Sequence, residues 1–321
     1  MTRTRAAVVG VGYLGKFHAE KYAAHPAVEL IAVVDQDRAR AEAVAAGLGV
    51  DALTDVSALR GRVDCASVAV PTVHHHAVAA ALLDAGIDVL LEKPMASDVA
   101  EAKALLEASI RGRRILQIGH LERFNPALRP LDGKIKEPRF IECQRLAPFT
   151  ERGTDVDVVF DLMIHDLDLI LSMVPSSLRA VEAVGIPVLT ESVDIANARL
   201  RFANGCIANV TASRVSLKRE RKLRVFQQDA YFSIDFDERR ARICHRLPVP
   251  NGSPSLHFDE IETQPGDALA AEIDAFVRAV RDRSEPPVTG WDGLRALDLA
   301  HVIRESVETE VRIARAGSVA R

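Results

Sequence analysis

Cysteine is scarce in this chain of 321 residues, and the few cysteines present lie far apart. Cys65, Cys143, Cys206 and Cys244 form no Cys-x-x-Cys pair. Such spacing does not suggest a disulfide framework, which is typical of small secreted domains. We therefore expect reduced thiols and a cytoplasmic location.

Long hydrophobic runs are also missing. No stretch approaches the roughly 18 uninterrupted apolar residues that a transmembrane helix needs, so we expect no membrane span. Arg3 and Arg5 precede a short apolar run, but the run meets a glycine at Gly10. A secretory signal needs an apolar core of roughly 7–15 residues, and this start is too short for one.

The chain lacks an excess of one charge, internal repeats and low-complexity tracts. Its net charge is -4, with 27% charged and 48% hydrophobic residues, which is an ordinary globular composition. This balance gives no argument for a nucleic-acid partner. The length predicts about two domains, each large enough for its own core.

A glycine-rich turn near the start indicates a nucleotide site. The apolar residues 6–9 predict a buried strand, and Gly10, Gly12 and Gly15 follow in the pattern G-x-G-x-x-G before a helix expected over 13–24. The first glycine permits the turn, the second lets a pyrophosphate approach, and the third lets the helix pack closely. The free N–H groups of the new helix favour phosphate, so we assign Tyr13 and Leu14 to the cofactor site as well.

An acidic residue follows at the spacing that dinucleotide sites require. Asp35 ends the predicted strand 29–35, twenty residues after Gly15, where a carboxylate binds the ribose hydroxyls. It would repel a 2′-phosphate, which favours NAD. Arg38 and Arg40 keep NADP open as an alternative, because an arginine there can hold that phosphate.

Helices and strands then alternate as in a doubly wound parallel sheet. The expected elements are a helix over 37–47, a strand over 64–70, a helix over 73–85, a strand over 88–92, a helix over 97–109 and a strand over 114–118. Thr72 is the expected cap of the third helix. Consecutive helical residues point about 100° apart, so the run His74–His76 cannot ligate one metal ion together. One of these histidines is instead expected at the nicotinamide end. No metal is expected.

The segment Glu92-Lys93-Pro94 places an ammonium group at the carboxyl end of a strand. Ligands of open α/β sheets bind at such ends, and the proline restricts the backbone around Lys93. The alternative is an ordinary surface lysine.

The residues after Gly119 are unusually polar. His120, Glu122, Arg123 and Asn125 precede Pro126, and Asn125 with this proline predicts a short helix to about residue 131. The segment is either only a hinge between domains or a hinge that also forms one wall of the substrate site. The second alternative is considered because clefts between domains are preferred ligand sites.

A mostly apolar helix, expected over 158–173, carries a carboxylate and an imidazole four residues apart. Asp161 and His165 would share one face, where the acid can set the tautomer of the imidazole, as in a general base. A structural histidine and a divalent-ion site are the alternatives. Asp166 and Asp168 are expected to point elsewhere.

The last third of the chain predicts an open antiparallel sheet of about five to six strands between residues 179 and 245, with Asn204-Gly205 as a hairpin turn. One face should pack on the helix 158–173, and the other is a natural dimer surface. The charged segment 217–222 is expected to be a solvated turn, with a grip on a substrate phosphate as the alternative. A polar loop over 248–265 and helices over 269–283 and 291–314, the latter capped by Asp292, complete the chain.

Together these motifs resemble the glucose–fructose oxidoreductase / inositol dehydrogenase (Gfo/Idh/MocA) family. The residues that carry the resemblance are the glycine motif, Asp35, Pro71 with His75, Glu92-Lys93-Pro94 and Asp161-x-x-x-His165. It implies a Rossmann NAD-binding domain over 1–120 and an α+β substrate-binding and oligomerisation domain over 121–321, with an open, mainly antiparallel sheet.

The resemblance also implies site residues. Lys93, Asp161 and His165 would be catalytic, often with a cis Lys93–Pro94 peptide. Pro71, Thr72, His75, Glu92 and Lys93 would join the cofactor site, although Thr72 stands where the family usually has asparagine. His120, Glu122, Arg123 and Asn125, with Asp161 and His165, would contact the substrate.

Within the family, the segments 119–126 and 161–168 are similar to the branch that acts on nucleotide sugars. This implies NAD-dependent oxidation at C3 of UDP-N-acetylglucosamine, giving a ketone for an aminotransferase in lipid A biosynthesis. The alternatives are a dehydrogenase of a free polyol such as myo-inositol, and a non-catalytic NAD-binding sensor. A homo-oligomer, dimer or tetramer, is expected through the C-terminal sheet.

Overall fold

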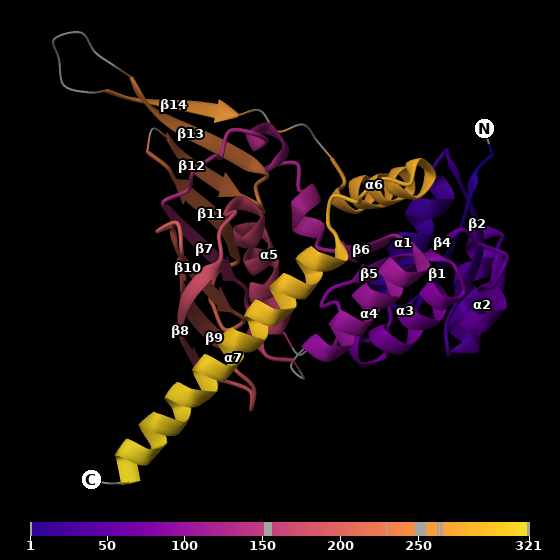
Figure 1. Cartoon of the computed structure of the whole chain (residues 1–321), viewed down its shortest axis with the longest axis horizontal. Helices are drawn as coiled ribbons and strands as arrows, with labels where there is room; N and C mark the ends of the chain where they lie inside the picture. The colour runs from indigo at the N-terminus through magenta and orange to yellow at the C-terminus, as the bar shows by residue number, and fades with distance from the viewer. Residues whose placement is uncertain are drawn as a thin grey trace. The chain divides into compact units, whose positions relative to one another are not determined.

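The computed structural model describes residues 2–150, 156–228, 230–247, 255–261, 263 and 266–319. The chain forms two compact units (Figure 1). The first contains Met1–Leu121 and Asp267–Leu297, and the second contains Glu122–Gly266 and Asp298–Arg321. The predicted boundary after residue 120 remains a prediction. The compact units differ from it in one respect, because 267–297 groups with the first sheet.

The first unit is built on a six-stranded parallel sheet with the order β3-β2-β1-β4-β5-β6. Its strands are β1 (Thr4–Val9), β2 (Val28–Val34), β3 (Asp51–Leu53), β4 (Cys65–Val68), β5 (Asp88–Glu92) and β6 (Leu116–Gly119). This order reverses direction between β1 and β4, which is the switch point where doubly wound sheets bind nucleotides. The predicted Rossmann sheet is confirmed, and β3 is an addition to it.

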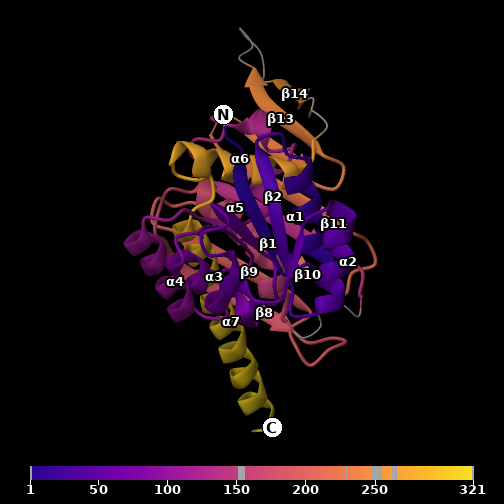
Figure 2. The same cartoon turned by 90° about the vertical axis from the view of Figure 1, so that its right-hand side faces the viewer.

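Helices cover this sheet. They are α1 (Tyr13–Ala24), α2 (Arg38–Leu48), α3 (His75–Asp84) and α4 (Val99–Gly112), and Figure 2 shows β1 between the pair α3 and α4 and the pair α1 and α2. The expected cap at Thr72 is wrong: residues Thr72–His74 form a 3-10 turn, and α3 begins after it without a side-chain cap. Helix α4 is capped by Asp98, whose side chain accepts from the N–H of Glu101.

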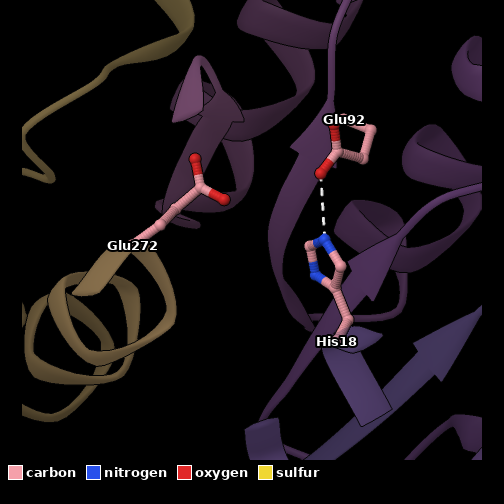
Figure 3. Close-up of side chains that lie close together, drawn as sticks. All are labelled: His18, Glu92 and Glu272. Atoms are coloured by element: carbon pink, nitrogen blue, oxygen red, sulfur yellow. Dashed lines mark hydrogen bonds and ion pairs between the residues drawn. The ribbon is translucent and has the colours of Figure 1, made fainter. Parts of the chain in front are cut away.

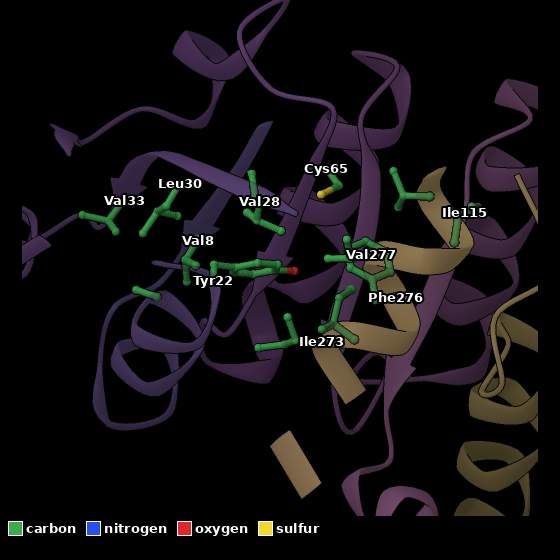
Figure 4. Close-up of a cluster of buried hydrophobic side chains, with 14 of the residues drawn as sticks. Val8, Tyr22, Val28, Leu30, Val33, Cys65, Ile115, Ile273, Phe276 and Val277 are labelled. Atoms are coloured by element: carbon green, nitrogen blue, oxygen red, sulfur yellow. The ribbon is translucent and has the colours of Figure 1, made fainter. Parts of the chain in front are cut away.

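Helix α6 (Ala268–Asp282) closes the core of the first unit. Ile273, Phe276 and Val277 from α6 share one buried cluster with Tyr22 and Cys65 (Figure 4). The apolar residues of α6 lie three and four apart, which gives the helix one apolar face. That periodicity predicts the helix but not the sheet on which it packs.

The second unit contains an eight-stranded sheet with the order β14-β13-β12-β11-β7-β10-β9-β8. The strands are β7 (Phe140–Leu146), β8 (Leu178–Ile186), β9 (Ile195–Phe202), β10 (Ile207–Ser213), β11 (Glu220–Phe226), β12 (Ala230–Asp235), β13 (Arg240–Leu247) and β14 (Ser255–Ile261). All neighbours are antiparallel except β7 and β10, which are parallel. The turn at Gly205, with φ of 84°, joins β9 and β10 as predicted.

The sheet is larger than the expected five to six strands. Strand β14 lies where a polar loop was expected over 248–265, of which 248–254, 262, 264 and 265 lie outside the described residues. The strand was not predicted because its charged residues resemble those of a loop. In the structure these charges pair across strands: Glu260 is the register partner of Arg242 and forms an ion pair with it. Part of the charged segment 217–222 likewise belongs to β11.

Two helices accompany this sheet. Helix α5 (Ile164–Met173) follows a π-helical turn, Val159–Met163, which the sequence did not predict, and it packs on β7 and β10 as expected. The long helix α7 (Gly290–Val319) starts after Thr289, whose hydroxyl accepts from the N–H of Asp292. The predicted cap at Asp292 is therefore wrong: Thr289 caps the helix, and the carboxylate of Asp292 accepts from the N–H of Thr289. The single helix expected from Asn125 is wrong, because only short 3-10 turns form, over Leu121–Phe124 and Arg129–Leu131. Among the described residues, no helix has the length and apolar character to cross a bilayer.

Candidate active site

The glycine turn after β1 has the shape that a pyrophosphate site needs. Gly10 has a φ of +82°, and a Cβ atom there would lie 2.8 Å from the carbonyl carbon of Ala69. A Cβ on Gly15 would lie 1.7 Å from the carbonyl oxygen of Gly10, so only glycine permits this close packing of α1. The space beside Gly12 is open within 4 Å. Helix α1 begins there without a side-chain cap, which leaves its first N–H groups for an anion.

A cavity of about 640 Å³ continues from this turn. Its lining includes Gly10, Gly12, Asp35, Arg40, Val70 and Pro71. The next residues of α1, Tyr13 and Leu14, are 74% and 40% exposed, and Thr72 is half-buried. The volume, the open side of Gly12 and the carboxylate at the end of β2 together fit a dinucleotide.

The arginines near Asp35 are already paired with carboxylates. Asp35 accepts from the N–H of Val11 at 3.0 Å, and its side chain lies 3.3 Å from the guanidinium of Arg40. Arg38 forms an ion pair with Glu42 on α2. A 2′-phosphate would compete with these acids for the arginines and would face Asp35 itself, so the charges of this site favour NAD over NADP.

His75 secures the backbone next to the predicted catalytic lysine. Strand β5 ends at Glu92, Lys93 is half-buried, and the Lys93–Pro94 peptide is cis, as the family resemblance implies. The ring of His75 is 1% exposed. Its Nδ1 lies 2.8 Å from the carbonyl oxygen of Pro94, and its Nε2 lies 2.9 Å from that of Val70. Burial lowers the pKa of His75, and the two carbonyl oxygens act in the opposite direction.

Glu92, assigned to the cofactor site from the sequence, is buried and held by a residue that the sequence did not single out. His18 of α1 lies 2.9 Å from its carboxylate, through Nε2. Glu272 of α6 completes a buried group of three (Figure 3). His18 lies three residues after Gly15 on the same helix. Glu272 follows Glu92 by 180 residues, so no sequence pattern connects it with His18.

The polar segment after β6 is fixed by ion pairs within the second unit. Arg145 of β7 is buried and bonds to Glu122 at 2.9 Å and to Asp166 at 2.8 Å. Burial alone would lower the pKa of Arg145, but the two carboxylates raise it. Burial also opposes ionisation of Glu122, yet Arg145 holds the pKa of that carboxyl below its usual value.

A second ion pair holds the next residue of the segment. Both oxygens of Asp168 accept from Arg123, at 2.6 and 2.9 Å. The side chain of Asn125 donates to Glu122 at 3.0 Å. His120, which belongs to the first unit, is 1% exposed. The expected substrate contacts of these residues remain predictions, and Asp166 and Asp168 are buried anchors that the sequence interpretation left without a role.

The two residues predicted as an acid–base pair lie in one continuous helical segment. Asp161 is part of the π-helical turn, and His165 is in the first turn of α5. Both side chains are half-buried. The wider π-helical turn changes the simple four-residue spacing from which their contact was predicted, and the pairing stays a prediction.

The chain matches two family models in succession. Residues 4–120 match the Gfo/Idh/MocA oxidoreductase family with an NAD-binding Rossmann fold, and residues 131–233 match the Gfo/Idh/MocA C-terminal domain. A UDP-N-acetylglucosamine 3-dehydrogenase from Acidithiobacillus ferrooxidans is 41% identical over 311 residues, which cover 96% of this chain and 98% of that protein.

Two further comparisons agree with this. The solved structure of the Acidithiobacillus ferrooxidans enzyme superimposes with a TM-score of 0.90 at 40% identity, covering 96% of this chain and 99% of that one. An inositol 2-dehydrogenase from Rhizobium meliloti is 27% identical over 96% of this chain and 98% of its own length. The chain belongs to the Gfo/Idh/MocA family of oxidoreductases, and its first unit is the family's NAD-binding Rossmann domain.

Proposed function

We propose that this enzyme oxidises the C3 hydroxyl of UDP-N-acetylglucosamine to a ketone with NAD. The observation that carries the proposal is the 41% identity, over nearly the whole of both chains, to a UDP-N-acetylglucosamine 3-dehydrogenase. The product would be UDP-2-acetamido-3-dehydro-2-deoxy-glucose. Its ketone is the group that an aminotransferase converts to an amine, so a 3-amino sugar for lipid A is the expected destination.

In the proposed mechanism, residues of this chain carry out the proton transfers. NAD, when bound, supplies the nicotinamide that accepts a hydride from C3. His165 takes the proton of the hydroxyl, and Asp161 stabilises the resulting imidazolium. Lys93 donates to the oxygen as negative charge develops on it, an interaction that is strong in a site shielded from water. Lys93 and His165 can exchange these roles.

The segment after β6 is proposed to bind the sugar. His120, Glu122, Arg123 and Asn125 are its polar residues. The ion pairs of Glu122 and Arg123 with Arg145 and Asp168 support a rigid segment, which binds a ligand at a lower entropic cost than a mobile loop. The enzyme is further proposed to be cytoplasmic and to form a homo-oligomer through the eight-stranded sheet.

A substrate panel tests this function. NADH absorbance is followed with UDP-N-acetylglucosamine, other UDP-sugars, myo-inositol and scyllo-inositol, with an aminotransferase added to remove the ketone. Reduction with UDP-N-acetylglucosamine alone is the expected result. Reduction with a polyol would assign the enzyme to the inositol branch instead, and NAD binding without turnover on either class would favour a sensor.

Substitution of the proposed catalytic lysine tests the mechanism. Lys93→Ala should lower kcat by roughly 10²–10⁴-fold, the usual contribution of general acid–base groups, with little change in NAD affinity. Lys103→Ala is the matched control, because Lys103 is an exposed lysine on α4. Normal turnover of the Lys93 variant would remove Lys93 from the mechanism.

A further inference from the structure

Helix α6 buries a carboxyl group in the first unit without an evident partner. The side chain of Glu272 is 0% exposed, and neither carboxyl oxygen has a hydrogen-bond partner among the residues that the structure describes. An ionised carboxylate in such a place is strongly disfavoured unless it is paired. In the described parts of the chain, no lysine or arginine forms an ion pair with it.

The surroundings of Glu272 come from three elements of the first unit. Its carboxyl points toward His18 of α1 and Glu92 of β5 (Figure 3), and one ligating atom from each of the three residues lies within 4.8 Å of the others. Tyr22 of α1 is a further titratable residue that interacts with Glu272, and its hydroxyl is bonded to Ser67 at 2.9 Å. The amide of Gln117 in β6 donates to the main-chain oxygen of Glu272 at 3.2 Å.

Ionisation of both carboxyl groups is disfavoured in this buried site, because their oxygens lie within 4.8 Å and each charge opposes the other. Glu92 has the better environment for a charge, since the imidazole of His18 lies 2.9 Å from it. Burial, and then the charge of Glu92, raise the pKa of Glu272 well above its usual range. The proton therefore belongs on Glu272.

Glu92 is also confined from the other side. A Cβ atom on Gly119 of β6 would lie 3.0 Å from Oε2 of Glu92. Glu92 thus fits between His18 and a glycine, with Glu272 facing the pair. Because Lys93 directly follows Glu92, a shift of this side chain and its backbone would move the lysine.

We propose that Glu272 is a positioning residue: its carboxyl stays protonated and donates to Glu92 through one bridging water molecule, while His18 donates to Glu92 from its Nε2. The network links the helix of the glycine turn, the strand that carries Lys93, and α6. This role depends on the proposed function only in the experiment that measures turnover of the sugar.

A metal ion is the competing occupant of this cluster. Structural zinc sites usually have four ligands, at about 2.0–2.2 Å for nitrogen and oxygen, whereas the described residues offer three here. The spacing of 2.9 Å between His18 and Glu92 is that of a hydrogen bond. The geometry therefore favours a hydrogen-bonded network over a metal site, and metal binding becomes an outcome of the test.

The first experiment needs no substrate. Infrared difference spectra of the wild type against Glu272→Gln at neutral pH should show the carbonyl stretch of a protonated carboxylic acid, lost in the variant. A carboxylate band in its place would overturn the proposal. So would one equivalent of zinc, measured by elemental analysis of the purified wild type and lost in Glu272→Gln.

The second experiment uses turnover and NAD binding. Glu272→Leu, which removes the donor, should lower kcat at least tenfold and leave the NAD dissociation constant within about threefold, whereas Glu272→Gln, a neutral donor of the same shape, should restore most of kcat. Asp282→Asn, at an exposed residue of α6, is the control. If Glu272→Leu does not fold, His18→Gln against His18→Leu makes the same comparison at the other donor.

Equal kcat in Glu272→Leu and the wild type would overturn the positioning role, as would an equal loss in the Leu and Gln variants. The infrared and metal measurements do not depend on the sugar. A wild type that is inactive on UDP-N-acetylglucosamine would therefore contradict the proposed function alone.

Discussion

The ring of His75 connects two backbone segments, one of which lines the cavity at the glycine turn: its Nδ1 lies 2.8 Å from the carbonyl oxygen of Pro94, and its Nε2 lies 2.9 Å from that of Val70. One contact fixes the residue after Lys93, and the other fixes the chain beyond β4. The sequence placed His75 near the nicotinamide. The structure shows why a histidine suits the position even without touching a ligand, because each ring nitrogen lies within hydrogen-bond distance of a carbonyl oxygen. The neutral ring donates to one of the two, depending on its tautomer, and only the imidazolium donates to both.

His75→Ala is accordingly expected to disturb the lysine more than the cofactor. We expect a fall in kcat of about tenfold or more, since small misplacements of catalytic groups cost up to about 10²-fold, with a smaller change in the NAD dissociation constant. Steady-state kinetics and a fluorescence titration with NAD measure the two effects. His76→Ala, the next histidine on α3, is the control. A loss confined to NAD affinity would show that His75 acts on the cofactor.

Asp35 has one structural contact in the glycine turn and one predicted contact with the cofactor, and its removal should affect both. Its carboxylate is expected to bind the ribose, and it also accepts from the N–H of Val11 inside the glycine turn. Hydrogen bonds to charged groups contribute about 1.5–3 kcal/mol, so Asp35→Ala should weaken NAD binding by roughly 10–100-fold. Discrimination against NADP should also decrease, because Arg40 loses a carboxylate partner.

Calorimetric titration of both cofactors checks this prediction. Glu42→Ala is the control, since it removes a carboxylate from α2 that pairs with Arg38 and not with Arg40. Unchanged NAD affinity in the Asp35 variant would exclude the ribose contact.

The buried arginine of β7 should be a major contributor to the stability of the second unit. Arg145→Met would leave Asp166 buried without its ion-pair partner and Glu122 with only Arg221, 3.7 Å away, and removing one partner of a buried ion pair costs about 3–5 kcal/mol. Arg242→Met, at an ion pair with Glu260 that is exposed on both sides, should cost about 0–1 kcal/mol. Urea unfolding monitored by circular dichroism measures both, and equal losses would contradict the role of burial.

Asp194 should make folding sensitive to acid. Its carboxylate accepts the N–H groups of Val188, Leu189 and Thr190 at 2.6–2.9 Å. Burial opposes its ionisation, but these bonds and one from the Thr190 hydroxyl, at 2.7 Å, together lower its pKa to about 2. An unfolded aspartate titrates near pH 3.9, so the unfolded chain binds this proton first as the pH falls.

The stabilisation is thus complete above about pH 4 and is lost between about pH 4 and pH 2, by roughly 2 kcal/mol. Urea unfolding of Asp194→Asn should show lower stability at pH 7 and a shallower decline below pH 4 than the wild type. Asp282→Asn, an exposed aspartate of α6, should decline like the wild type. A parallel decline in the Asp194 variant would contradict the prediction.

Local signals account for the parts of the fold that the sequence revealed. The glycine spacing, the strand ending at Asp35 and the alternation of elements predicted the first sheet, because each depends on residues close together in the chain. Strand β14 was not predicted, because its charged residues resemble those of a polar loop until their partners on β13 are known. The π-helical turn at Asp161 was also not predicted, because apolar periodicity does not distinguish such a turn from an α-helix.

Partners distant in sequence account for what was missed at the site. Asp166 and Asp168 were read as acids facing away from the chemistry, and only Arg145 and Arg123 explain their burial. Glu272 gave no signal, because a single glutamate in an amphipathic helix is ordinary until His18 and Glu92 are placed beside it.

The position of α6 has a consequence for synthesis of the chain on the ribosome. The core of the first unit includes Ile273 and Phe276, so its nucleotide-binding half remains incomplete until the whole second sheet has been translated. Domains generally fold as units during synthesis, starting with the N-terminal one. In this chain the first unit is synthesised first but is expected to complete its folding late. A chain released after residue 266 should expose apolar surface around Tyr22, and binding of a hydrophobic dye would detect that surface.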